Sequence, residues 1–173
     1  MTFRELIRAR RSVRAFTAEP LDAEHLIAIL EAANLAPSAG NLQGYEIYVV
    51  RAVERRLELA QAASGQEHVA QAPVVLAFCA NPARSVEKYG ERGARLYSVQ
   101  DATIACTYAM LAAAELGYGT VWIGAFDEDQ VWALLEAPEG VRPVALLPIG
   151  RTEERPNPRM RRPLEDLVHE VDA

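Results

Sequence analysis

Cysteine is scarce in this chain of 173 residues, and the two that occur lie far apart. Cys79 and Cys106 form no CxxC pair, and neither belongs to a cluster of cysteine and histidine residues. Disulfide frameworks and structural zinc sites both depend on closely patterned cysteines or histidines. We therefore expect neither kind of site.

Net positive charge and long apolar runs are missing as well. The formal net charge is −6 and the isoelectric point is about 5.2. Because nucleic acids and anionic membranes are generally bound by basic surfaces, we expect neither partner. The uncharged, mostly apolar stretch over 102–114 is too short to span a bilayer. The first residues contain no apolar run typical of a signal peptide, so we expect a cytoplasmic protein.

The composition that remains is typical of a globular protein. Half of the residues are apolar and 24% are charged. A chain of this size buries roughly 68–70% of its unfolded surface. No internal repeat or low-complexity segment divides the sequence. We therefore predict a single domain that spans residues 1–173.

Hydrophobic periodicity and cap residues predict an α+β fold with four strands and four or five helices. The motif Thr2-x-x-Glu5 is typical of a capping box, and Asp22 and Asp127 are placed to cap two later helices. Helices are expected after these three caps and over 53–64 and 98–116. Strands are expected over 45–50, 74–79, 119–124 and 144–149.

Two segments differ from the ordinary amphipathic elements of this pattern. Residues 81–97 are polar and interrupted by glycine, which is typical of a mobile surface excursion. The helix over 98–116 is rich in alanine and must be covered on most of its sides. Because the chain is short, a second protomer is one source of that cover.

An arginine cluster near the start is the first candidate site. Arg10, Arg11, Ser12 and Arg14 crowd three guanidinium groups and one hydroxyl into five residues. Crowded like charges are unfavourable unless an anion is present, and arginine forks match phosphate oxygens. The segment is either a phosphate clamp or a solvated basic turn.

A second cluster near the end contains Arg159, Arg161 and Arg162. In an extended segment Arg159 and Arg161 lie on the same face. The cluster either closes on the same anion as the first one or serves as a basic tail that aids solubility. The occurrence of both clusters in an acidic chain favours a shared anion.

The loop over 37–43 presents amide and hydroxyl groups just before an expected strand. Asn41 and Gln43 each carry a donor and an acceptor, which suits the edge of a heteroaromatic ring. Pro37 and Gly40 also explain the loop as a simple helix stop. Local sequence leaves both interpretations open.

The segment 117–126 contains glycines that partly match a dinucleotide fingerprint. Its order is helix then strand, which excludes a Rossmann site. The backbone N–H groups of Gly124 and Ala125 are still placed to meet a ligand. No GxSxG, Walker or HExxH motif occurs, and no nucleophile–base pair is evident, so no catalytic side chain is assigned. This combination indicates that a bound cofactor performs the chemistry.

Five segments in order carry a family resemblance: RRSVRAF, PSAGNLQ, GYGTVWIGAF, PIGR and RMRRPLEDLVHE. Together they resemble the nitroreductase family of FMN-dependent oxidoreductases. The resemblance implies a nitroreductase-like α-β-α sandwich that forms an intertwined homodimer with FMN at the interface. The FMN-binding residues that it implies are Arg10, Arg11, Ser12, Arg14, Pro37, Ser38, Asn41, Gln43, Ile123, Gly124, Ala125, Arg159 and Arg161.

The resemblance also implies how these residues divide. Residues 10–14 would contact the FMN phosphate and its ribityl chain or ring, and Arg159 and Arg161 would complete the phosphate site. The groups at 37, 38 and 41 would come from the other protomer, and 123–125 would lie along the flavin ring. The family often has Gln-Pro-Trp where this chain has Gln43-Gly44-Tyr45.

The activity implied by the resemblance is hydride transfer from NADH or NADPH, through flavin N5, to a small oxidised acceptor such as a nitroaromatic or a quinone. One pocket serving both substrates implies ping-pong kinetics. The alternatives are a flavin-binding protein without turnover, or an enzyme of the same fold that performs dehalogenation, enone reduction or flavin cleavage. A helical interaction module without any cofactor is a third possibility.

Overall fold

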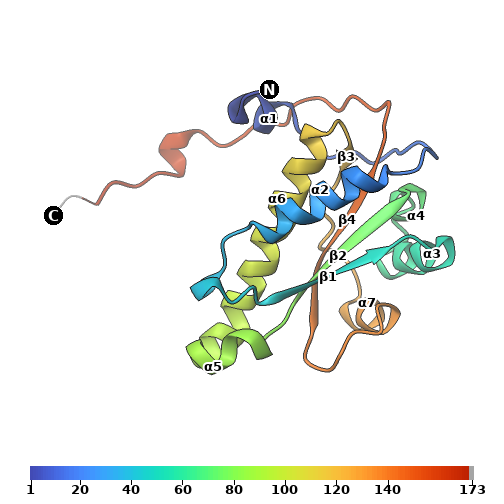
Figure 1. Cartoon of the computed structure of the whole chain (residues 1–173). Coiled ribbons are helices and arrows are strands. Elements are labelled where there is room, and N and C mark those ends of the chain that lie inside the picture. The colour runs from blue at the N-terminus through green and yellow to red at the C-terminus, as the bar shows by residue number, and fades with distance from the viewer. Residues whose placement is uncertain (172–173) are drawn as a thin grey trace.

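A computed structural model describes residues 1–171, which contain a sheet of four antiparallel strands. The strand order is β1 (Tyr45–Val50), β2 (Val74–Ala80), β4 (Arg142–Gly150) and β3 (Gly119–Thr120). Helices cover both faces of this sheet (Figure 1). The α+β prediction is therefore confirmed, with helices, sheet and helices as its three layers.

The three predicted cap residues begin helices as expected. Thr2 and Glu5 form a capping box, and the Asp22 carboxylate accepts a hydrogen bond from the N–H of Glu24 at 2.8 Å. Asp127 accepts one from the N–H of Gln130 at 2.9 Å. The helices are α1 (Phe3–Ala9), α2 (Ala23–Asn34), η1 (Ala39–Asn41), α3 (Val53–Ala62), α4 (His68–Gln71), α5 (Ala83–Arg92), η2 (Gly93–Tyr97), α6 (Ser98–Glu115), α7 (Glu128–Leu134) and η3 (Leu164–Asp166). None of these helices within residues 1–171 is long and apolar enough to cross a bilayer.

The strand β2 is buried on both faces because every one of its residues is apolar. Successive side chains of a strand point to opposite faces of the sheet. Leu76 and Phe78 therefore pack in the layer with α2 and α6, whereas Val75 and Ala77 pack in the layer with α3, α4 and α7. The continuous apolar run predicted this two-sided burial.

Residues 81–97, expected to form a mobile surface excursion, are instead mostly helical. They form α5 and η2, and Ser85 and Gly93 are buried. A Cβ atom at position 93 would lie 2.6 Å from the carbonyl oxygen of Ser85, so glycine permits a close approach of backbone there. Gly93 is therefore a packing residue, whereas Gly90, with φ 58° and ψ −148°, interrupts the helix as the sequence predicted.

The strand expected over 119–124 is shorter than predicted. Only Gly119 and Thr120 pair with β4, and Ile123 forms an isolated bridge to Leu146. On its other side Thr120 accepts a hydrogen bond from the N–H of Val13 at 2.9 Å. The N-terminal segment therefore lies beside β3, and the prediction of one continuous strand was wrong. The short helix α4 was not predicted.

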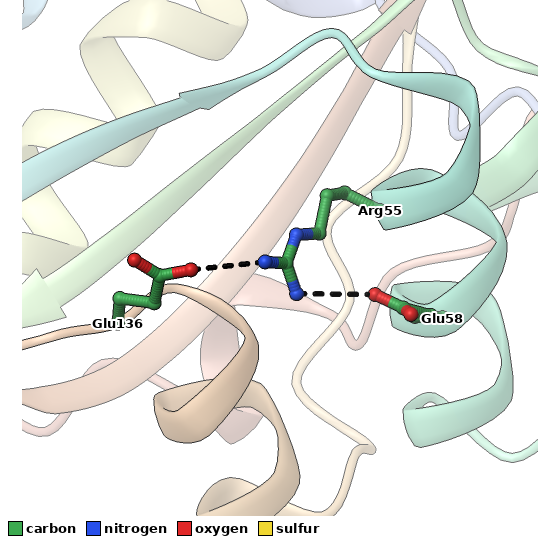
Figure 2. A network of polar contacts seen from close by, with 3 residues as sticks. All are labelled: Arg55, Glu58 and Glu136. Carbon is green, nitrogen blue, oxygen red and sulfur yellow. Dashed lines mark hydrogen bonds and ion pairs between the residues drawn. The ribbon is translucent and has the colours of Figure 1, made fainter.

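An ion-pair network on the outer face joins α3 to the end of α7. The Arg55 guanidinium donates to Glu136 at 2.9 Å and to Glu58 at 3.3 Å, as Figure 2 shows. All three side chains are substantially exposed, so each pair stabilises the fold by only about 0–1 kcal/mol. The network illustrates how an arginine at this surface is neutralised, in contrast to the arginines described next.

Candidate functional site

The two arginine clusters, although far apart in the sequence, line one cleft. The cleft has a volume of about 760 Å³ and opens between the segment after α1 and the C-terminal tail. Its lining residues include five of the predicted arginines and the predicted serine: Arg10, Arg11, Ser12, Arg14, Arg159 and Arg161. The chain thus brings together the two clusters that the sequence indicated separately.

Backbone pairing places the first cluster. Ser12 pairs in parallel with Thr120 of β3, and the N–H of Thr17 donates to the carbonyl of Arg151 at 2.9 Å. The segment between Ser12 and Thr17 therefore runs beside β3 and the first residue after β4. Because the C-terminal tail leaves β4 at that residue, both segments start beside the end of β4 that pairs with β3 (Figure 1).

Two side chains of the tail then hold the segments together. Glu154 Oε2 accepts hydrogen bonds from the N–H groups of Arg14 at 2.6 Å and Ala15 at 3.0 Å. Thr152 Oγ1 donates to the carbonyl of Ala15 at 2.7 Å and accepts from the N–H of Glu154 at 3.0 Å. We call this pair the Thr152–Glu154 clasp. Sequence reasoning missed it, because nothing local in the tail distinguishes Glu154 from the acid beside it.

The cleft carries an excess of positive charge, and its arginines form no ion pair with a carboxylate among the described residues. Within residues 1–171, ion pairs form at Arg55, Arg95, Arg142 and Arg151, and none forms at the five cleft arginines. Burial lowers the pKa of Arg10 below its ordinary value, and the charges of Arg161 and Arg11 lower it further. Both effects disfavour the charged guanidinium, so an anion in the cleft would relieve them.

The cleft arginines are not equally free. Arg11 Nη1 donates to the backbone carbonyls of Arg8 at 2.5 Å and Arg10 at 2.9 Å. Its guanidinium therefore serves the loop after α1 as well as the cleft. Glu154 also lines the cleft, but its Oε2 atom is engaged by the backbone N–H groups of the clasp.

His68, at the start of α4, lies close enough to this cluster to be influenced by it. Its pKa is lowered by burial first and then by the positive charge of Arg14, while Glu154 acts in the opposite direction. Its Nε2 atom is buried and has no hydrogen-bond partner in the part of the chain described. Sequence reasoning found no role for this histidine, because its proximity to Arg14 and Glu154 arises only from tertiary packing.

The loop over 37–43 lies outside this cleft. Pro37 and Ser38 line a separate cavity of about 480 Å³ against residues of α6. Asn41 and Gln43 have left-handed backbone angles, and Gln43 Nε2 donates to Asn41 Oδ1 at 2.8 Å. The two amide side chains are therefore bonded to each other in this chain. The cavity that this loop lines and the arginine cleft share no lining residue.

The third predicted group divides according to its backbone hydrogen bonds. The N–H of Ile123 donates to the carbonyl of Leu146 at 2.9 Å, so it is not available to a ligand. Gly124 and Ala125 are exposed. A Cβ atom at Gly124 would meet nothing closer than Trp122 Nε1 at 3.5 Å. The surface beside Gly124 is therefore open enough to accept a flat group.

Comparison with known families explains why these segments occur together. Residues 7–151 match the model of the nitroreductase family. The chain belongs to the nitroreductase family. The match covers the first arginine cluster, the 37–43 loop and the 123–125 segment, while the second arginine cluster lies beyond it.

Curated relatives in the nitroreductase family cover most of this chain. The "FMN reductase [NAD(P)H]" of Bacillus subtilis is 36% identical, and the alignment covers 92% of this chain and 70% of the relative. The "NADH dehydrogenase" of Thermus thermophilus is 32% identical, with 92% of this chain and 91% of the relative covered.

Solved structures of the nitroreductase family share the fold. The NADPH:FMN oxidoreductase from Vibrio harveyi, complexed with NAD+, superimposes with a TM-score of 0.89 and 32% identity over 98% of this chain and 74% of that one. A family member from Streptococcus pneumoniae superimposes with a TM-score of 0.88 and 27% identity, covering 98% and 100% of the two chains. The nitroreductase fold predicted from the motifs is confirmed.

The structure gives a role to each residue at the point where the sequence departs from the common nitroreductase pattern. The N–H of Gly44 donates to Asp101 Oδ2 at 3.1 Å, which a proline at this position would be unable to do. The Tyr45 hydroxyl is buried and donates to the carbonyl of Ala33 in α2 at 3.1 Å. Both residues of this Gly-Tyr pair therefore have structural contacts.

Proposed function

We propose that this nitroreductase family chain is an FMN-dependent oxidoreductase that uses NADH or NADPH as reductant. The observation that carries the proposal is the cleft in which two distant arginine clusters converge, with the five predicted arginines against one carboxylate and no ion pair at any of the five within the described residues. A phosphate monoester is a dianion that guanidinium forks bind through paired hydrogen bonds. The donor set of the cleft therefore fits the phosphate of FMN.

The roles of the residues follow from their chemistry. Arg10, Arg14, Arg159 and Arg161 would hold the phosphate by charge-assisted hydrogen bonds, and Ser12 would add a hydroxyl donor. The bound flavin would supply two-electron redox chemistry between NAD(P)H and a small acceptor such as a nitroaromatic or a quinone, in a ping-pong cycle.

The flavin ring would lie between two further segments. The groups of the 37–43 loop would meet the ring on one side, and the exposed backbone at Gly124 and Ala125 would meet it on the other. Fixed N–H dipoles at this position would stabilise negative charge on the ring. The side chains of the chain thus bind and orient, and none of them reacts.

We further propose a homodimer in which the 37–43 loop of one protomer completes the cleft of the other. The proposal rests on two observations: the cavity that the loop lines shares no lining residue with the arginine cleft, and many large apolar side chains are exposed at both ends of the chain. The exposed apolar residues at the ends are Met1, Phe3, Ile7, Met160, Leu164, Leu167, Val168 and Val171. Each protomer would be a single domain, and a cytoplasmic location is proposed with it.

The test is a visible spectrum of the purified protein combined with gel filtration and anaerobic reduction. The expected protein is yellow, releases FMN on denaturation, elutes as a dimer and is bleached by NADH or NADPH. A folded, colourless protein that takes up no added FMN would overturn the proposal. A yellow protein that neither nicotinamide bleaches would favour a flavin-binding protein without turnover. Anaerobic screening of nitro, halogenated, enone and quinone acceptors separates the remaining chemistries.

A further inference from the structure

A buried carboxylate in α6 holds both ends of the 39–44 loop. Asp101 is only 2% exposed. Its Oδ1 atom accepts a hydrogen bond from the N–H of Ala39 at 2.9 Å, and its Oδ2 atom accepts one from the N–H of Gly44 at 3.1 Å. No cationic side chain within residues 1–171 pairs with this carboxylate. Its charge is therefore committed to the loop backbone.

The loop has a conformation that needs such support. Gly40, Asn41 and Gln43 have φ angles of 57°, 59° and 45°. The left-handed region is unfavourable for residues with a Cβ atom, and such residues persist there only where the surrounding structure constrains them. Ser38 adds one constraint, because its Oγ atom accepts a hydrogen bond from the N–H of Gln43 at 3.0 Å. Asp101 supplies the two bonds that tie the loop to a rigid helix.

The packing around Gly44 is an independent sign that this contact is specified. A Cβ atom at position 44 would lie 2.6 Å from Ser85 Oγ and 3.1 Å from Asp101 Oδ2. Glycine therefore lets the N–H of residue 44 reach the carboxylate without a shift of the Ser85 hydroxyl. Ser85 is fully buried, and its Oγ atom has no hydrogen-bond partner among the described residues.

We propose that Asp101 is a positioning residue for flavin binding. By holding the N–H groups of Ala39 and Gly44, it fixes the loop that presents Ser38 and Asn41 to the flavin ring. Asp101 touches the loop backbone and acts on the flavin only through it. This inference rests on the proposed function, because the contact between the loop and the flavin is part of that proposal.

The first arm of the test needs no flavin. Amide hydrogen exchange is measured by NMR on the full-length protein stripped of cofactor, for the wild type and for Asp101→Asn. An asparagine keeps one carbonyl acceptor, so the N–H of Ala39 or of Gly44 loses its partner and should exchange about tenfold faster or more. Unchanged exchange at both amides would overturn the proposal.

The matched control is Thr107→Val. Thr107 lies on the same helix, and its hydroxyl donates to the carbonyl of Thr103 at 2.9 Å within α6. This variant removes a partly buried hydrogen bond without touching the loop. It should leave the exchange of Ala39 and Gly44 as in the wild type. Equal acceleration in both variants would show general loosening of α6 and overturn the proposal.

The second arm compares FMN with riboflavin, which lacks the phosphate. If Asp101 positions a loop that meets the ring, Asp101→Asn should weaken both flavins by the same factor, about three- to tenfold, because it lowers the fraction of chains competent to bind. An effect on FMN alone, or on neither flavin, would overturn the proposal. If the wild type binds neither flavin, the proposed function fails. Faster amide exchange in Asp101→Asn would still show that Asp101 holds the loop, so the two failures are distinguishable.

A second route tests the same contact if Asp101→Asn does not fold. Gly44→Ala places a methyl group against Ser85 Oγ and should speed exchange in the loop and weaken both flavins. Adding Ser85→Ala removes the obstructing atom and should restore part of the wild-type behaviour. A Gly44→Ala protein that behaves like the wild type would overturn the proposal.

Discussion

Replacing Arg161 with alanine should weaken FMN binding without destabilising the protein. Arg161 is exposed, lines the cleft and makes no ion pair within the described residues 1–171. Its charge is one of the causes that lower the pKa of Arg10, which shows that the two guanidinium groups repel each other. Without an anion this charge contributes nothing favourable, and with a phosphate it contributes a charge-assisted hydrogen bond.

The magnitudes of the two effects differ enough to be separated. A hydrogen bond to a charged group contributes about 1.5–3 kcal/mol, so the dissociation constant of FMN should rise by about one to two decades. Removing one exposed charge changes the free energy of unfolding of the cofactor-free protein by at most about 1 kcal/mol. The free energy of unfolding should stay the same or rise, because the substitution removes the repulsion between Arg161 and Arg10.

The assay is a fluorescence titration with FMN and with riboflavin, together with urea unfolding of the cofactor-free protein. Arg162→Ala is the matched control, because Arg162 does not line the cleft and its Nη2 atom donates to the carbonyl of Asp166 at 3.3 Å. Arg161→Ala should weaken the binding of FMN but not of riboflavin, and Arg162→Ala should weaken neither. The difference in FMN affinity between wild type and Arg161→Ala should shrink as salt is raised, because salt screens charges and the Debye length is about 10 Å at 0.1 M. Equal losses for FMN and riboflavin, or for both variants, would refute the shared phosphate cleft.

Further predictions concern the clasp, the histidine, a buried arginine and the thiols. Glu154→Ala should weaken FMN by about tenfold despite removing a negative charge from the cleft, because the N–H groups of Arg14 and Ala15 both lose the oxygen that accepts from them. Tighter binding would show that charge outweighs positioning. The pKa of His68 is lowered from 6.5 in the folded state, so the unfolded state binds more protons and the free energy of unfolding should fall as the pH drops through about 6.5. His68→Gln should remove this pH dependence in a series of urea unfolding experiments, and an equal pH dependence in both proteins would contradict the prediction. Arg56 Nε donates to the carbonyl of Arg51 at 3.1 Å, and its Nη1 donates to the carbonyls of Ala70 and Ala72. Arg56→Met leaves these carbonyls unpaired and should lower the free energy of unfolding by roughly 2–4 kcal/mol. Arg55→Met removes only exposed ion pairs and should change it by less than about 1 kcal/mol. Burial raises the pKa of the Cys79 thiol to about 12 and that of the Cys106 thiol well above its ordinary value. Neither thiol should therefore react with an aromatic disulfide reagent at pH 8 until the protein unfolds. Rapid reaction of either thiol in the folded protein would contradict their burial.

Local sequence predicted the elements whose signals are short in range. The capping residues Thr2, Asp22 and Asp127 act within one helical turn, so their positions were readable directly. The run over β2 is apolar throughout, and that alone indicates burial on both faces. Over residues 81–97 glycine was only a partial guide, because Gly90 does interrupt the helix whereas Gly93 allows close packing.

The candidate site shows a similar division. The motif order identified the family and the residue types suited to a phosphate, and the structure places the two arginine clusters on one cleft. Which backbone donors remain free was not readable, since the N–H of Ile123 is taken by Leu146 on a distant strand.

The sequence by itself determined the α+β class, the helix starts, the buried strand and the family, because caps, apolar periodicity and ordered motifs are properties of neighbouring residues. Only the tertiary structure decided that Glu154 binds the backbone at Arg14 and that Asp101 binds the loop at Ala39 and Gly44. Glu154 lies 140 residues along the chain from Arg14, and Asp101 lies 57 residues from Gly44. A hydrogen bond between distant segments depends on how the sheet and helices pack, and no local pattern of residues encodes that geometry.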